Sequence, residues 1–377
     1  MNASLNEKLR TVKWGDYKMG KLFQRVKTNK LPYKADELPN RPLGEYTLPC
    51  LTSSFNNQGL NYYAPREGAT VLKNVISIPS NSDVYRAYYQ PNDFTVLSDA
   101  YAIRWIFDDR ELSTRQYLFV VMCINKVTDL SIYSYKNKLG GWNVVRNKHI
   151  QLPQKRGEID FDFMESFIAE LEAERVAELE AYLTVSGLDN YELSNDEENA
   201  LQNFQSLKWD TYNLEKLFGK STRGKRLKGD DRVAGTLPFV TAGEASEGVS
   251  AYISNDVEVF EENTTTIDMF GSAKYRNYKY GADDHVAVVH TESVPMKAAI
   301  FVTSACHKAA HTGKFDYGHN FYAKDADALD IQLPTKDGKP DYDAMAALIS
   351  AVQKLVIKDV VLYADRKIEK TRAVTKH

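Results

Sequence analysis

The most basic stretch of the chain is the loop Gly219–Gly229, which reads Gly-Lys-Ser-Thr-Arg-Gly-Lys-Arg-Leu-Lys-Gly. Its glycines let the backbone approach a ligand closely, and its cations can neutralise phosphates or bond to guanine edges. The candidate DNA-binding residues are Lys220, Ser221, Thr222, Arg223, Lys225, Arg226 and Lys228. This is not a nucleotide-hydrolysing phosphate loop, because Leu214 stands where that motif has its first glycine. The loop predicts contact with DNA, with a solvated turn as the alternative.

Further residues suit the same chemistry. Two Tyr-Arg pairs fit phosphates, sugars and base edges, although strands packed on a core use the same residue types. A less dense basic loop covers 25–41, and the loops 133–143 and 315–320 carry polar donors that suit base readout or packing between modules. The candidates in these groups are Lys27, Lys30, Lys34, Tyr85, Arg86, Lys136, Lys138, Tyr275, Arg276, His319 and Asn320.

Catalytic patterns are weak throughout the chain. His307 and His311 have the spacing of a helical zinc site, but the glutamate after the first histidine and a third ligand are both missing. There is no serine elbow, no glycine fingerprint for a dinucleotide, and no Asn-Pro-Pro-Tyr tetrad of the adenine methyltransferase type. The paired carboxylates Asp283 and Asp284 are interpreted as a turn. The sequence therefore predicts no catalytic residue and no metal site.

The elements that position these residues occur twice. Lys13–Phe23 returns as Lys208–Phe218, and Ile150–Pro153 returns as Ile331–Pro334. Weaker echoes lie between these markers: Leu48-Pro49 with Leu237-Pro238, Thr52 with Thr241, Gly59 with Gly248, Tyr63 with Tyr252, and Tyr85-Arg86 with Tyr275-Arg276. A repeat of this length predicts two similar modules of domain size, which suits the reading of two half-targets on one ligand.

Each module is predicted to mix strands and helices. β-Branched and aromatic runs predict strands at 71–78, 94–97 and 101–106 in the first module, and at 237–241 and 286–289 in the second. Ser113 can cap a helix that runs through Asn125, and 298–305 is the equivalent helix of the second module. Ser194 and Glu197 form a plausible capping box for a short connecting helix. The predicted fold class is therefore mixed α/β (α+β).

A long amphipathic helix is expected after each module, one from Phe161 to Leu183 and one from about Met345 to Leu362. The first is Glu-rich and the second is mildly basic, which favours pairing of the two helices. The predicted interface residues are Met164, Ile168, Leu171, Leu179, Met345, Leu348, Val352 and Leu355. Twenty helical residues span about 30 Å, close to the ~34 Å turn of duplex DNA. The alternative is that each helix packs on its own module.

Charge is distributed unevenly along the 377 residues, although the net charge is only −3. Residues 1–150 carry 21 Lys and Arg against 13 Asp and Glu, whereas residues 151–206 carry 3 against 14. A basic module followed by an acidic connector can grip a polyanion at one end and repel it at the other.

Composition limits the class of protein further. Hydrophobic residues make up 43%, enough for sizeable cores. No apolar run approaches the roughly 18 residues of a membrane span, and the N-terminus lacks a signal peptide core. The three cysteines Cys50, Cys123 and Cys306 are widely spaced, which fits a reducing cytoplasmic location rather than a disulfide framework.

The motifs resemble those of specificity (S) subunits of restriction–modification systems. The shared pattern is Ile-Gln-Leu-Pro, then Gly, Asp, an aromatic residue, Asp and Met ahead of a long helix, together with the entry motif Lys-Trp-x-x-Tyr at each module. The resemblance covers both repeats and is closest to type I and related type IIB systems. One departure is that Arg175 and Asp359 interrupt the helical stripes.

The resemblance implies target-recognition domains at 1–157 and 206–335, and helical conserved regions at 158–205 and 336–377 that form an antiparallel coiled coil. It implies that this chain binds double-stranded DNA without catalysis and without a cofactor of its own. Partner methyltransferase subunits would carry S-adenosylmethionine, and restriction subunits can join the complex. The alternatives left open are a nuclease or DNA-modification enzyme with its own active site, and a scaffold that binds only protein.

Overall fold

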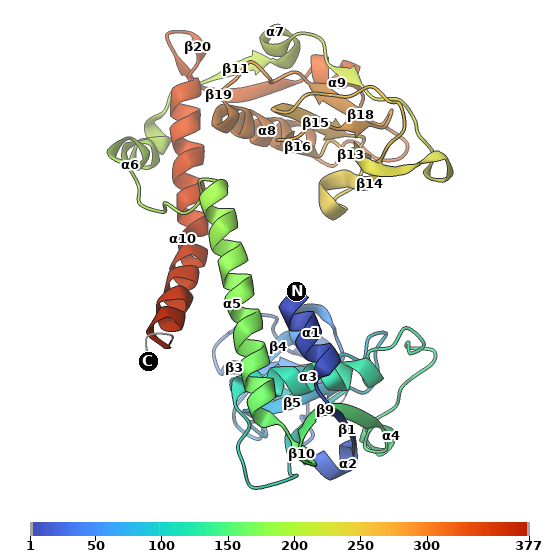
Figure 1. Ribbon diagram of the computed structural model, residues 1–377. Coiled ribbons are helices and arrows are strands. Elements are labelled where there is room, and N and C mark those ends of the chain that lie inside the picture. The colour runs from blue at the N-terminus through green and yellow to red at the C-terminus, as the bar shows by residue number, and fades with distance from the viewer. Residues whose placement is uncertain (1–2, 98, 375–377) are drawn as a thin grey trace. The chain divides into compact units, whose positions relative to one another are not determined.

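The computed structural model describes residues 3–97 and 99–374. The chain divides into two compact units, one formed mainly by the residues up to Leu179 and the other by Glu180–Glu369 (Figure 1). Each unit mixes strands and helices, so the predicted fold class is confirmed. The boundary falls inside a long helix, and the four-part division inferred from the resemblance stays a prediction.

The first unit contains three small sheets. Its strands are β1 (Trp14–Lys18), β2 (Phe23–Arg25), β3 (Tyr46–Leu51), β4 (Leu60–Pro65), β5 (Val75–Pro79), β6 (Tyr88–Gln90), β7 (Thr95–Val96), β8 (Ala100–Trp105), β9 (His149–Lys155) and β10 (Glu158–Ile159). Its helices are α1 (Ala3–Thr11), α2 (Met19–Leu22), α3 (Thr114–Thr128), α4 (Trp142–Val145) and the start of α5 (Phe161–Val185), with 3-10 turns η1 (Ala35–Glu37) and η2 (Asn56–Gly59). The strand orders are β1-β9-β10, β2-β8-β5-β6 and β4-β3-β7.

The second unit repeats this plan. Its strands are β11 (Trp209–Asn213), β12 (Thr222–Arg223), β13 (Ala234–Val240), β14 (Val249–Ile253), β15 (Thr264–Asp268), β16 (Ala273–Arg276), β17 (Gly281–Ala282), β18 (Val286–Val289), β19 (Asp330–Lys336) and β20 (Lys339–Pro340). Its helices are α6 (Asn195–Gln202), α7 (Leu214–Phe218), α8 (Met296–Ala310), α9 (Ala323–Asp327) and most of α10 (Tyr342–Val374), with 3-10 turns η3 (Phe204–Ser206), η4 (Gly229–Asp231) and η5 (Ala245–Gly248). The orders β11-β19-β20, β12-β18-β15-β16 and β14-β13-β17 match those of the first unit.

The strand register confirms the internal repeat. Trp14 pairs with Pro153 at the start of the β1–β9 ladder, and Trp209 pairs with Pro334 in the β11–β19 ladder. In the third sheet of each unit, Pro49 faces Tyr63 as Pro238 faces Tyr252. In both units this third sheet also contains one parallel pair, β3 with β7 and β13 with β17.

One amphipathic helix packs against the four-stranded sheet of each unit. Ser113 caps α3, as the sequence predicts, and the structure shows a full capping box with Gln116. The helix α8 lies beside β15 and β16 (Figure 1), and it buries small residues such as Ala298, Val302 and Cys306. This helix begins two residues before the predicted segment and ends five residues after it. The β-branched residues of α8 lower its intrinsic helix propensity, and packing of the helix on the core offsets this loss.

The long helices α5 and α10 begin inside the cores of the units that precede them. Met164 and Ile168 belong to the first core, with Leu171 packed against it, and Met345 belongs to the second core. The pairing predicted for Met164, Ile168, Leu171 and Met345 is therefore replaced by packing on their own domains, which was the alternative. Burying Met164, Ile168 or Met345 contributes roughly 1.5–3 kcal/mol to its domain.

The remaining residues of the predicted interface differ in exposure. Leu348 is buried, Leu179 is half-buried, and Val352 and Leu355 are exposed. A paired-helix brace built on these four residues stays a prediction.

Two general features of the described chain agree with its composition. Cys50, Cys123 and Cys306 are all free and buried, and burial raises the pKa of the Cys50 thiol to about 11 and those of the other two to about 12. Such thiols are poor nucleophiles near neutral pH. Among the helices of the described residues, none is both long enough and apolar enough to cross a bilayer.

Candidate nucleic-acid interface

The basic loop Gly219–Gly229 has an anchored backbone. The helix α7 ends at Phe218, and its C-cap Gly219 has a φ of +77°, which suits glycine. Two residues later, the Ser221 N–H donates to the Asp327 carboxylate at 2.7 Å. Gly224 lies against the next strand so closely that a Cβ there would be 1.7 Å from the Ala282 carbonyl oxygen. The amide of Lys225 then donates to that same oxygen at 3.0 Å. A loop held at these points presents its side chains in a defined arrangement.

The cations of this loop are exposed. The side chains of Lys220, Arg223, Lys225 and Lys228 make no ion pair with any other described residue. Arg226 is also exposed and lies close enough to Asp284 to help lower the pKa of that carboxyl. Unpaired, solvated cations are the groups that release counterions when a protein meets a phosphate backbone.

The two hydroxyls of the loop point into the domain, which corrects their place among the DNA-contact candidates. The Ser221 Oγ is buried, and the Thr222 Oγ1 is bonded to His290 Nε2 at 3.0 Å. The Gly-Lys-Ser-Thr run also follows the end of a helix instead of preceding one, so it lacks the helix N-terminus on which a phosphate loop depends.

Carboxylates lie beside the basic loop on the turn before β18. Burial and the neighbouring Asp284 raise the pKa of Asp283 to about 6, while a hydrogen bond from Asp283 lowers the pKa of Asp284. Asp283, Asp284 and His285 bring three ligand atoms within 4.8 Å of one another, the one such group of three or more among the described residues. All three are partly exposed, and exposed acidic turns commonly hold no ion, so no metal role is assigned to them.

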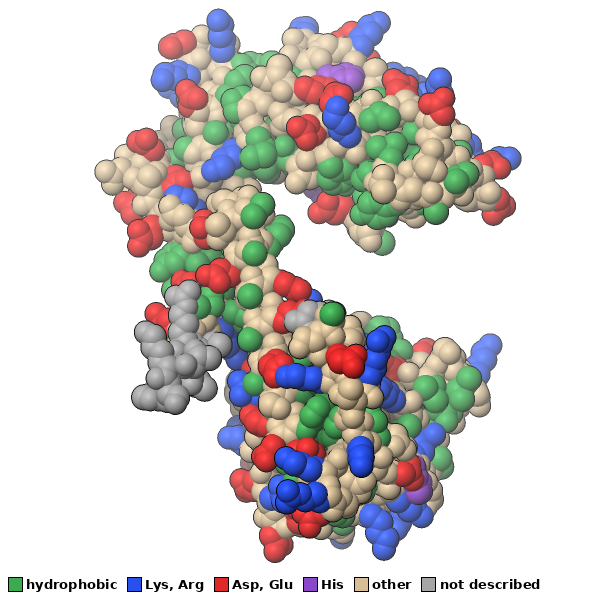
Figure 2. All heavy atoms as spheres, viewed as in Figure 1, with side chains coloured by type: hydrophobic (Ala, Val, Ile, Leu, Met, Phe, Trp, Pro, Cys, Tyr) green, Lys and Arg blue, Asp and Glu red, His purple; other side chains and the backbone are tan. Residues whose placement is uncertain are grey.

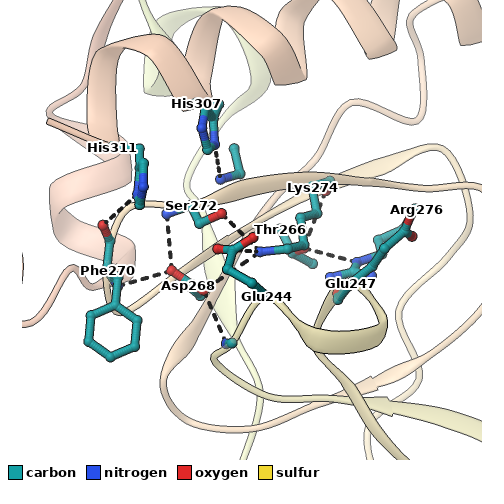
Figure 3. Close-up of polar contacts among 12 residues, drawn as sticks. Glu244, Glu247, Thr266, Asp268, Phe270, Ser272, Lys274, Arg276, His307 and His311 are labelled. Atoms are coloured by element: carbon teal, nitrogen blue, oxygen red, sulfur yellow. Dashed lines mark hydrogen bonds and ion pairs between the residues drawn. The ribbon is translucent and has the colours of Figure 1, made fainter. Parts of the chain in front are cut away.

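The two histidines of α8 have structural roles. Their rings stack with centroids 4.7 Å apart. The Nδ1 of His307 accepts from the Ala273 amide at 3.2 Å, and the Nδ1 of His311 is bonded to the Phe270 carbonyl at 3.2 Å (Figure 3). Each ring therefore ties the helix to the sheet beside it.

The first unit has a basic loop in the equivalent place, after β2. Leu31 and Leu38 are buried in a small core of their own, and Asn29 donates to Thr70 and Gly68. The predicted cations Lys27, Lys30 and Lys34 are all exposed; Lys27 comes just before these anchors, and the other two lie between them. Lys136 and Lys138 are exposed on another loop of this unit, where the Lys138 ammonium sits 4.7 Å from the centre of the Tyr135 ring. Figure 2 shows Lys and Arg side chains spread over the visible face of the first unit, with acidic side chains among them.

The Tyr-Arg pairs are corrected by the structure. Tyr85 is buried in the first core, and Arg276 is 1% exposed, so neither side chain is offered to a ligand. Arg86 is exposed but paired with Asp129 at 2.6 Å, and the half-buried Tyr275 donates to Asn263. The two pairs are also not equivalent in the fold. The residue opposite the start of β15 is Arg276, whereas the residue opposite the start of β5 is Gln90.

Of the two candidate DNA-binding residues on the loop 315–320, only His319 is exposed to solvent. His319 is exposed and closes a turn with Asp316. Asn320 is half-buried, and its amide donates to the Tyr322 hydroxyl at 3.2 Å.

A second pair of loops was not singled out by sequence reasoning. They join β3 to β4 and β13 to β14, and their ends, Thr52 with Gly59 and Thr241 with Gly248, are bonded through the backbone at 2.9 and 2.8 Å. The two matching Thr and Gly positions were visible in the sequence as echoes. The backbone conformation between them was not, because its residues differ between the repeats.

Comparisons with known proteins agree with this arrangement. Residues 11–181 match the model of the type I restriction modification DNA specificity domain. The chain is 25% identical over 253 residues to the type II restriction enzyme specificity subunit S.BcgI of Heyndrickxia coagulans, covering 66% of this chain and 69% of that one. The crystal structure of a type I restriction–modification S subunit from M. genitalium superimposes with a TM-score of 0.60 at 12% identity, covering 97% of this chain and 94% of that one.

Residues 11–181 therefore belong to the family of type I restriction–modification DNA specificity domains, and the chain as a whole shares the fold of an S subunit. The family match covers the first domain and most of α5. The second domain repeats the sheet orders and register of the matched one, so both are domains of the same kind. The exposed cations therefore lie on the matched specificity domain and on a second domain that repeats its fold.

Proposed function

We propose that this specificity subunit reads a bipartite site on double-stranded DNA, with one half-site bound by each domain. The observation that carries the proposal is the repetition of one fold with different exposed loops. The basic loop of the second domain is dense in cations, whereas its counterpart after β2 is longer and sparser. Two copies of one scaffold with unlike loops fit two unlike half-sites better than one symmetric site.

In this proposal the exposed cations of the loops bind the phosphate backbone of the DNA. Lys220, Arg223, Lys225, Arg226 and Lys228 grip phosphates on the second half-site. Lys27, Lys30, Lys34, Lys136 and Lys138 do the same on the first. Phosphate contacts fix position and supply salt-dependent affinity, and sequence is read by other groups that reach the base edges.

The chain in this proposal has no catalytic residue and holds no cofactor. It recruits methyltransferase subunits, which bring S-adenosylmethionine and methylate adenine, and restriction subunits can join the same assembly. The chemistry of the described residues fits a reader of this kind. The thiols are buried, the α8 histidines are bonded to backbone groups, and the acidic turn at Asp283 lies among exposed cations.

Methylation mapping tests the proposal. Genomic DNA would be compared between cells that carry this gene with its partner methyltransferase and cells from which this gene alone is deleted. We expect a methylated motif of two defined parts separated by unspecified bases, which disappears on deletion. Methylation or cleavage by the purified chain alone would instead identify an enzyme. Persistence of the motif without this gene would contradict the proposal.

A further inference from the structure

The loops after β3 and β13 contain the same unusual backbone. In the first domain Asn57 (φ 46°, ψ 40°) and Gln58 (φ 54°, ψ 26°) are both left-handed, and Gly59 follows with φ 92°. In the second domain Ser246 (φ 48°, ψ 37°) and Glu247 (φ 55°, ψ 28°) are left-handed ahead of Gly248. Two successive non-glycine residues in this region are strained, and such strain persists only where the surrounding structure enforces it.

Equivalent donors hold both loops in this conformation. The Arg276 guanidinium donates to the Glu247 carbonyl at 2.9 Å and to Thr266 Oγ1 at 3.0 Å (Figure 3). In the first domain Gln90 takes the same register position, and its amide donates to the Gln58 carbonyl at 3.5 Å and to Ser77 Oγ at 3.0 Å. A guanidinium and an amide thus make the same pair of contacts.

The second loop has an additional buried support. Asp268 is 4% exposed, and its carboxylate accepts from the amides of Phe270 and Ser272 at 3.0 Å and from that of Gly243 at 3.2 Å. Lys274 reaches both Asp268 and Glu244 (Figure 3). Hydrogen bonding to Ser272, with Lys274 nearby, lowers the pKa of the Glu244 carboxyl. The conformation is therefore built by the sheet beneath the loop.

What these loops present to solvent differs between the domains. The four tip residues are exposed in each case, Phe55–Gln58 in the first domain and Glu244–Glu247 in the second, while the glycine that follows is buried. The side chains of Asn56 and Gln58 make no hydrogen bond to another described residue, and neither does the carboxylate of Glu247. The two domains thus share one loop backbone but present different polar side chains that are not hydrogen-bonded within the protein. This pattern is expected of a loop that determines specificity.

The charge of the tips argues against phosphate contact. Neither tip contains a lysine or an arginine, and the second carries two glutamates, which a phosphate backbone would repel. Base edges suit these groups better. Asn and Gln amides match the donor and acceptor of adenine in the major groove, and a carboxylate accepts from the amino group of cytosine.

We propose that the two left-handed tips read base edges in the major groove, the first through the amides of Asn56 and Gln58 and the second through the carboxylate of Glu247. This inference rests on the proposed function, because it assigns sequence reading to loops of the same two domains. The first tip then requires adenine in one half-site, and the second requires cytosine in the other.

Methylation mapping of loop variants, each assembled with the partner methyltransferase in cells, tests this inference. For the variant pair Asn56→Ala and Gln58→Ala, we expect discrimination at one or two positions of the first half-site to fall at least tenfold, with the second half-site unchanged. For Glu247→Gln, we expect a cytosine position of the second half-site to relax or to change to adenine, with the first half-site unchanged.

A control variant and the wild type separate the possible failures. Asp337→Ala changes an exposed residue with φ 53° on the β19–β20 turn, away from the tips, and is expected to leave the motif intact. An unchanged motif in all tip variants, or an even loss of methylation at every position, would overturn the inference while the proposed function stands. A wild-type subunit that directs no two-part motif would overturn both.

Discussion

Lys354 donates a hydrogen bond to the Glu197 carboxylate at 2.8 Å and so joins α10 to α6 within the second unit. Ser350 donates to the same carboxylate, and the Ser194–Glu197 capping box starts α6 at this point. Burial alone would raise the pKa of Glu197, but the hydrogen bonds from Lys354, Ser350 and the Ser194 amide lower it to about 2. The first half of α10 is therefore fixed by a partly buried ion pair as well as by apolar packing.

The lowered pKa of Glu197 predicts a pH-dependent contribution to stability. A carboxyl with a lower pKa in the folded state stabilises the fold above its unfolded value of 4.5, and this contribution is lost as the pH falls toward 2. Glu197→Gln should lower the free energy of unfolding of the second unit by about 3 kcal/mol at pH 7, and by much less near pH 2. Urea unfolding at both pH values measures this. Glu198→Gln, on the exposed side of α6, should change it by less than about 0.5 kcal/mol. Equal effects of the two variants would contradict the account.

A side chain at Gly224 should clash with the neighbouring backbone, whereas a side chain at another glycine of the basic loop should not. A Cβ at this position meets the Ala282 carbonyl at 1.7 Å, so Gly224→Ala must displace one of the two backbones. We expect the free energy of unfolding to fall by about 3 kcal/mol and DNA affinity to fall with it. Gly229→Ala is the matched control, because no atom lies within 4 Å of a Cβ there. Thermal unfolding compares the two, and a Gly224→Ala protein as stable as the Gly229→Ala protein would refute the packing described.

The exposed cations of the basic loop predict a change in salt dependence. Removing Lys225 and Arg226 together should reduce the slope of log affinity against log salt by about 1.8, at roughly 0.9 for each phosphate contact on duplex DNA. Affinity should fall uniformly for specific and unspecific duplexes. The titration uses the complex with its methyltransferase partner, and the control removes Lys336 and Lys339 from the β19–β20 hairpin. A slope that the loop variant leaves unchanged would remove the loop from the interface.

The packing of α5 and α10 predicts where the apolar residues of these two helices contribute to stability. Met164 is fully buried in the first core, so Met164→Ala should destabilise the first unit by about 2–5 kcal/mol. Val352 is 46% exposed, and Val352→Ala should cost less than about 1 kcal/mol in the isolated chain. Denaturant unfolding distinguishes the two. A larger loss for Val352→Ala would support the paired-helix brace instead.

Much of the fold was predictable, because its signals are local and occur twice. Ser113 and Ser194 cap the helices predicted to begin there, Ser194 in the predicted capping box with Glu197, and the predicted strand at 286–289 has the observed bounds. The repeat motifs also mark the segments that form the β1–β9 and β11–β19 ladders, although no strand was predicted there. These features depend on residues within one turn or one strand of each other, or on direct comparison of two similar segments.

Parts of the candidate site could not be predicted, because they depend on tertiary packing. Arg86 and Arg276 each follow a tyrosine in the sequence, but Arg86 is exposed and Arg276 is buried. Only the strand register shows that Gln90 is the residue of the first domain that is equivalent to Arg276. Likewise, a hydroxyl such as that of Thr222 looks like a phosphate ligand until His290 is placed beside it. The left-handed tips were missed for a related reason. The left-handed backbone is adopted here by residues other than glycine, so the residue type does not predict it: Asn57, Gln58, Ser246 and Glu247.

The claim that two domains of one subunit read two half-sites is tested most directly by varying the DNA between the half-sites. One inserted base pair rotates one half-site by about 35° relative to the other. The affinity of the assembled complex would be measured for the native duplex, for duplexes with either half-site scrambled, and for duplexes with one base pair added or removed between them. The account predicts that each change weakens specific binding at least a hundredfold. Full affinity for a duplex with a single intact half-site, or indifference to the spacing, would contradict it.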